Sequence, residues 1–264
     1  MLQNAGRPTV TTETGSVEAR SIGGLYMSEG PGPPSQERIW SHFQNQQLEA
    51  FEGAAPRLDF LAKQATKRVR TPRRKAATVG VGDGHLERQL ATQGWEVIVV
   101  DPNAEALSRL AIDGVEGRQG VMESLPIDDN AVDVVIASEV LEHLDEDQGR
   151  LAVIETARIL RPAGWFLGTV PYAEDIPAYR VACPRCGEVF HRWGHQRSFD
   201  RESMRAELSQ AFASVEVQTR AFLDFRRRSL GGFGKSALRW TLGRIGSQLA
   251  VPNIYFAATE PRPR

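Results

Sequence analysis

The segment ATVGVGDG, residues 77–84, decides the fold of this 264-residue chain. It begins as a short apolar run typical of a strand, and residues 85–93 after it have the apolar spacing of a helix. Gly80, Gly82 and Gly84 let the backbone pass close to a ligand, while the free amides at the start of the helix can meet an anionic group. The segment therefore predicts a strand, a glycine-rich turn and a helix that together bind a cofactor.

A second strand supports this interpretation. Residues 95–100, WEVIVV, form a β-branched run typical of a strand buried on both faces, and Asp101 follows, 17 residues after Gly84. A carboxylate at this point can accept hydrogen bonds from the ribose hydroxyls of an adenosine cofactor. The dinucleotide fingerprint G-x-G-x-x-G is not met, because its last position is His85, and the spacing is instead G-x-G-x-G.

The rest of the chain alternates strand and helix patterns, which predicts an α/β fold with a mostly parallel sheet. Further strands are expected at residues 131–137, 164–170, 215–221 and 253–259, and further helices at 104–112, 148–160 and 201–212. The chain divides into a disordered tail (1–34), N-terminal helices that form a lid or brace (35–75) and the main domain (76–264), which contains insertions at 172–197 and 226–250.

Three more segments carry a resemblance to a known family: GVMESLP at 120–126, DVVIASEVLEHL at 133–144 and LRPAGW at 160–165. With the glycine-rich turn, they make the chain similar to the class I methyltransferases that use S-adenosylmethionine (SAM), over about residues 76–222 and the last strand. The resemblance implies a Rossmann-like sheet of seven mostly parallel strands with flanking helices. It also implies SAM as cofactor, bound by Gly80, Gly82, Gly84, Asp101, Met122 and Ser138.

Two positions depart from the family pattern. The family usually has an acidic residue just before V-G-x-G, where this chain has Thr78, and often has an aspartate at the position of Val121. These changes affect how tightly SAM is expected to bind and not the fold.

A cysteine- and histidine-rich segment, CPRCGEVFHRWGH at residues 183–195, follows the fifth strand. Its spacing C-x2-C-x4-H-x3-H offers four N/S ligands, which predicts a structural Zn²⁺ held by Cys183, Cys186, His191 and His195. The segment also resembles an insertion, C-P-x-C-G-x-x-F-H-x-x-G-H, of a subset of bacterial class I methyltransferases. Three alternatives stay open: a redox pair, cysteines that merely pack, or one histidine left free near the active site.

The segment leaves the carboxyl end of a strand, where open α/β sheets bind ligands, so we expect it to wall the acceptor pocket. A hydroxyl acceptor must also lose a proton, and His143, in the turn after the fourth strand, is the candidate base. The alternative is that His143 only packs in its turn. The predicted function is methyl transfer to a hydroxyl of a sugar or another small-molecule or glycan acceptor.

Two rival functions remain. A zinc knuckle with Phe190 and Trp193, together with basic runs at 63–75 and 226–250, would suit a nucleic-acid (RNA) methyltransferase or binding module. The other rival is a non-catalytic adaptor that uses the cysteine–histidine loop to bind a protein.

Composition limits the partners of the protein. The formal net charge is −1, so no global field attracts nucleic acid or membrane. No apolar run approaches the ~20 residues that span a bilayer, and residues 1–30 lack a secretory pattern, so we expect a cytoplasmic protein. Residues 226–250 contain six basic residues and no acid, which predicts either a helix packed on the core or a peripheral contact with an anionic membrane. The sequence leaves the oligomeric state undetermined.

Overall fold

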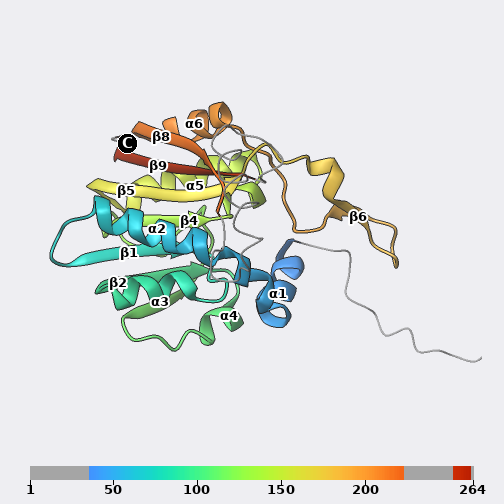
Figure 1. Cartoon of the computed structure of the whole chain (residues 1–264), viewed down its shortest axis with the longest axis horizontal. Helices are drawn as coiled ribbons and strands as arrows, with labels where there is room; N and C mark the ends of the chain where they lie inside the picture. The colour runs from blue at the N-terminus through green and yellow to red at the C-terminus, as the bar shows by residue number, and fades with distance from the viewer. Residues whose placement is uncertain (1–35, 223–251, 263–264) are drawn as a thin grey trace, which may run out of the picture. The chain divides into compact units, whose positions relative to one another are not determined.

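Seven strands form one twisted sheet in the order β3-β2-β1-β4-β5-β9-β8 (Figure 1). This computed structural model describes residues 36–222 and 252–262. The strands of the sheet are β1 (Arg74–Val79), β2 (Trp95–Asp101), β3 (Val115–Gln119), β4 (Val132–Ser138), β5 (Leu160–Pro171), β8 (Phe212–Arg220) and β9 (Asn253–Pro261). Only β9 runs antiparallel to its neighbours, so the sheet is mixed, with the predicted parallel part at its centre.

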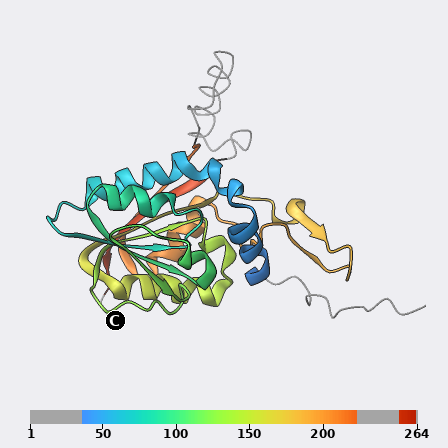
Figure 2. The same ribbon diagram turned by 90° about the horizontal axis from the view of Figure 1, so that it is seen from below.

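Helices cover both faces of the sheet (Figure 2). They are α1 (Gln36–Gln46), α2 (Ala55–Arg68), α3 (His85–Thr92), α4 (Ala104–Ser108), α5 (Glu146–Ile159) and α6 (Arg201–Ser209). Successive strand residues point to opposite faces, and β4 shows the result: Val134 and Ile136 pack with α2 and α3, whereas Val135 and Ala137 pack with α5 and α6. Each central strand is therefore buried on both faces, as its apolar sequence requires.

Several elements differ from the sequence-based prediction, among them β3, α4 and α5. Strand β3 was not predicted, because its residues VEGRQ are mostly polar and it lies at the edge of the sheet. The helix expected at 104–112 ends at Ser108. Helix α5 begins two residues early, because Asp145 and Gln148 form a reciprocal capping box at its first turn.

The predicted insertion between β5 and α6 has its own small structure. It contains the 3₁₀ turn η3 (Ile176–Tyr179) and a hairpin of β6 (Arg180–Ala182) and β7 (Val189–His191), which pair only with each other. Both views show the hairpin extending from the side of the domain where α1 lies (Figures 1 and 2). The predictions for residues 1–34 and 226–250 lie outside the described residues. Within residues 36–222 and 252–262, none of the helices has the length and apolar character needed to cross a membrane.

Candidate functional site

The glycine-rich turn has the conformation that its sequence predicts. Gly80, Gly82 and Gly84 all have positive φ angles, of 82°, 50° and 74°. The amide of Gly80 donates to the carbonyl of Val100 at 2.9 Å, which ties the turn to β2. A Cβ on Gly84 would lie 2.6 Å from Leu110 Cδ2. The conformation of the turn therefore requires glycine at all three positions, and the third also permits close packing.

Asp101 is held at the carboxyl end of β2, beside this turn. It is only 1% exposed, and burial raises the pKa of its carboxyl group. Its Oδ2 accepts hydrogen bonds from the amide of Val81 and from Gln44 Nε2, both at 2.8 Å, and its Oδ1 accepts from the amide of Asn103. The carboxylate is thus oriented by the turn and by α1 together.

A cavity of about 260 Å³ lies between α1 and the loop after β2. Its lining includes Trp40 and Gln44 from α1, Pro102 and Asn103 from the loop, and Gln119 at the end of β3. Asp101 does not line the cavity itself, but Gln44, which donates to Asp101, and Pro102, which follows it, both do. The cavity is somewhat below the usual range for ligand pockets. Helix α1 thus contacts Asp101 through Gln44, and the lid or brace role of the N-terminal helices stays a prediction.

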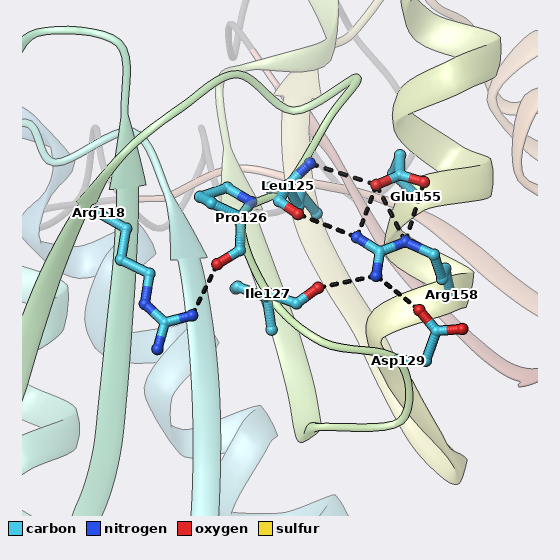
Figure 3. A network of polar contacts seen from close by, with 7 residues as sticks. All are labelled: Arg118, Leu125, Pro126, Ile127, Asp129, Glu155 and Arg158. Carbon is cyan, nitrogen blue, oxygen red and sulfur yellow. Dashed lines mark hydrogen bonds and ion pairs between the residues drawn. The ribbon is translucent and has the colours of Figure 1, made fainter.

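The segment GVMESLP after β3 is anchored by two arginines, and one of them, Arg118, donates from Nη1 to the carbonyl of Pro126 at 2.6 Å (Figure 3). Arg158 of α5 donates to the carbonyls of Leu125 and Ile127, and its guanidinium also pairs with Glu155 and Asp129 at 2.7 Å. Because the Arg158 side chain is mostly buried, these hydrogen bonds and ion pairs hold the loop firmly against α5. The predicted cofactor residue Met122 lies in this segment, with its side chain packed in the core.

At the carboxyl end of β4, Ser138 contacts a cation that the sequence analysis did not identify. Arg57 of α2 donates from Nε to Ser138 Oγ at 3.0 Å, and its Nη1 lies 3.6 Å from Glu139 Oε2. Glu139 has a positive φ of 57° and accepts from Asn253 of β9. No spacing pattern connects Arg57 with these residues, because they come from different elements of the fold.

The four predicted zinc ligands do not converge. The amide of Cys183 bonds to the carbonyl of Glu188 at the closed end of the hairpin, whereas His191 pairs with Arg180 at the open end. Three residues of extended chain separate the two ends by roughly 10 Å. In the described ranges, side chains whose possible metal-ligating atoms lie within 4.8 Å of one another form two groups of three. Neither group contains Cys183 or Cys186, so the structure does not bring the four predicted ligands together within the described residues, and the zinc site stays a prediction.

The histidines instead meet carboxylates. One group is Glu174, His191 and His195, and the other is Glu142, His143 and His195. His195 Nδ1 lies 2.5 Å from Glu174 Oε2, and the rings of His191 and His195 stack with centroids 4.6 Å apart. The short 3₁₀ turn η2 (Leu141–His143) after β4 is therefore in contact with the insertion after β5.

His143, the predicted base, lies in this cluster. Its Nδ1 is 3.2 Å from Trp40 Nε1 and 3.3 Å from the carbonyl oxygen of Gly194. Burial, reinforced by the neighbouring His195, lowers the pKa of His143 to about 3. Its ring is neutral at pH 7 and only weakly basic, which makes it a poor acceptor for a hydroxyl proton.

Several residues of this site were not predicted from sequence. Glu142 lies inside the quoted segment 133–144, so the resemblance could have drawn attention to it. Gln44, Arg57 and Glu174 carry no such signal, because only the packing of α1, α2 and the insertion brings them to the edge of the sheet.

Comparisons with known proteins agree with this architecture. A family model described as a methyltransferase domain matches residues 77–168. An uncharacterized methyltransferase of Mycobacterium tuberculosis is 34% identical over 162 residues, which cover 60% of this chain and 59% of that protein. The phthiotriol/phenolphthiotriol dimycocerosates methyltransferase of the same species is 27% identical over 176 residues, covering 65% of this chain and 60% of that protein.

Among solved structures, a phosphoethanolamine N-methyltransferase of Haemonchus contortus in complex with S-adenosylhomocysteine is similar, with a TM-score of 0.62. It is 16% identical, and the match covers 88% of this chain and 61% of that one, so it speaks for the fold. The matched segment begins in β1 and contains the glycine-rich turn, Asp101 and the end of β4. Residues 77–168 therefore match a methyltransferase domain, the chain spans about 60% of the length of these two relatives, and its fold is that of a SAM-dependent methyltransferase.

Proposed function

We propose that this protein transfers the methyl group of SAM to a hydroxyl of a sugar or another small-molecule or glycan acceptor. The observation that carries the cofactor assignment is Asp101, buried beside the glycine-rich turn and bonded to Gln44, which lines the cavity under α1. A buried carboxylate there supplies hydrogen-bond acceptors for the ribose hydroxyls, and Arg57 supplies a positive charge for the carboxylate of SAM.

The reaction needs little covalent chemistry from the protein. The acceptor oxygen forms a bond to the methyl carbon while the carbon–sulfur bond breaks, the electron pair stays on sulfur, and the hydroxyl proton leaves to solvent water. The cluster around His143 and His195 lies at the carboxyl ends of β4 and β5, where open α/β sheets bind ligands. Polar, titratable side chains at this place support an acceptor that loses a proton during the reaction, as a hydroxyl does. One relative is named for phthiotriol and phenolphthiotriol lipids.

The test combines binding and product analysis. Calorimetry with the full chain should show binding of SAM and of S-adenosylhomocysteine. The protein is then incubated with methyl-deuterated SAM and, separately, with a pool of hydroxylated metabolites and glycans, a pool of amines and a pool of RNA. We expect the deuterated methyl group to appear in the hydroxylated pool. Mass spectrometry of cells with and without the gene would identify the product. Label confined to RNA or to amines would overturn the hydroxyl assignment, and a protein that fails to bind SAM would be an adaptor.

A further inference from the structure

Glu142 is a buried carboxyl group to which the described part of the chain offers no hydrogen bond. Its side chain is 1% exposed, and neither carboxylate oxygen has a hydrogen-bond partner among the described residues. The carboxylates of Glu139 and Glu174 lie close enough to repel a negative charge on Glu142, whereas the Arg57 guanidinium attracts it. A buried carboxylate without hydrogen bonds is costly unless a proton or a cation compensates it.

His195 is oriented as a metal-binding histidine would be. Its Nδ1 is 2.5 Å from Glu174 Oε2, and Glu174 also lies 3.7 Å from His191 Nε2. When the carboxylate accepts the Nδ1 proton, the other ring nitrogen, Nε2, carries a lone pair. Such carboxylate–histidine pairs hold the ring and its tautomer in metal sites.

His143 completes the group, because one ligand atom from each of Glu142, His143 and His195 lies within 4.8 Å of the others. With its proton on Nδ1, the ring of His143 donates to the carbonyl of Gly194 at 3.3 Å and presents a lone pair on Nε2. The alternative tautomer accepts from Trp40 instead.

We infer that Glu142, His143 and His195 bind a divalent first-row transition-metal ion, with Glu174 as the positioning residue that holds His195. Two imidazoles and one carboxylate suit manganese, iron, cobalt or zinc rather than calcium or magnesium. Of the four ligands that the sequence predicted, this set keeps only His195. Glu142 and His143 take the place of Cys183, Cys186 and His191. Three protein ligands leave positions open for water or for an acceptor oxygen.

The inference also deepens the proposed function, on which this step rests. A cation at the carboxyl end of β4 would lower the pKa of an acceptor hydroxyl bound to it, so that the proton leaves to solvent water as the oxygen attacks the methyl carbon. The chain would then need no strongly basic histidine.

Binding of Co²⁺ to the metal-stripped full chain is the direct test. We expect one ion per chain, with a visible spectrum that lacks a thiolate-to-cobalt charge-transfer band. Glu142→Gln and His195→Gln should each weaken binding at least about 10-fold, and Glu174→Gln should weaken it by a similar factor through His195. The exposed control Glu96→Gln and the double variant Cys183→Ser/Cys186→Ser should bind Co²⁺ as the wild type does.

Thermal melting keeps the test decisive if a variant folds poorly. Without metal, Glu142→Gln should melt at or above the wild-type temperature, because it removes a buried carboxyl group. At the same Co²⁺ concentration, the melting temperature of the wild type and of both controls should rise more than that of Glu142→Gln. A thiolate band that disappears in the double cysteine variant, or no Co²⁺ binding by protein that still binds SAM, would overturn the inference. Absence of SAM binding with intact Co²⁺ binding would instead contradict the proposed function.

Discussion

Gln44 donates its side-chain amide to Asp101 Oδ2 at 2.8 Å, although 57 residues separate the two in the chain. Asp101 already accepts two backbone amides, so its carboxylate has little remaining capacity to accept both ribose hydroxyls. If Asp101 binds the ribose as we propose, cofactor binding requires Gln44 to release this carboxylate. Helix α1 would then compete with the cofactor for Asp101, and its residues also line the nearby cavity.

We expect Gln44→Ala to bind SAM about five-fold more tightly, since the ribose no longer displaces a hydrogen bond worth about 1 kcal/mol. Titration calorimetry of both proteins measures the difference. Asn45→Ala, a neighbouring change in the same helix, is the matched control and should have a smaller effect. Weaker binding by Gln44→Ala would mean that the amide contacts the cofactor itself.

Asp101→Asn should weaken SAM binding by about 1–3 kcal/mol, because the ribose loses charge-assisted hydrogen bonds while the shape of the site is kept. The same calorimetric titration applies, with circular dichroism to verify folding. Asp147→Asn, at a 92% exposed side chain in α5, should bind SAM as the wild type does. Equal affinities for all three proteins would show that the ribose site lies elsewhere.

Glu87, in α3, is expected to make stability depend on pH. Burial raises the pKa of its carboxyl group from 4.5 to about 7 in the folded state, although the nearby Thr78 hydroxyl opposes the shift. The folded protein thus keeps this proton up to a higher pH than the unfolded chain does. The contribution to stability is full below about pH 4.5 and is lost as the pH rises through 7.

Glu87→Gln removes the titrating group and keeps its neutral shape. Urea unfolding should find the variant more stable than the wild type at pH 8, by up to about 3 kcal/mol, and similar to it at pH 5. A difference that does not change between pH 5 and pH 8 would rule out titration of Glu87 as its cause.

Arg158→Lys should lower the free energy of unfolding by about 1–3 kcal/mol, because lysine cannot reach both loop carbonyls and both carboxylates at once (Figure 3). SAM affinity should fall as well, since the loop after β3 loses its anchor. Arg150→Lys, an exposed position in the same helix, serves as control. If Arg158→Lys is as stable as the wild type, the carbonyls of Leu125 and Ile127 lose nothing by bonding to water in place of the guanidinium.

Much of this protein follows from local sequence. The glycine-rich turn could be predicted because three positive φ angles in one turn require glycine at three positions. The central strands could be predicted because residues buried on both faces must be continuously apolar. The edge strand β3 could not, since only pairing with β2 makes its polar residues a strand.

The cysteine–histidine segment marks the limit of such reasoning. Its spacing correctly indicated an insertion after β5, but spacing cannot set the register of a hairpin, and pairing His191 with Arg180 carries the histidines away from Cys183. Tertiary structure alone placed His195 between Glu174 and Glu142 and brought Gln44 to Asp101. The physical reason is that turns and strands depend on neighbours in sequence, whereas a site between elements depends on how their apolar faces pack.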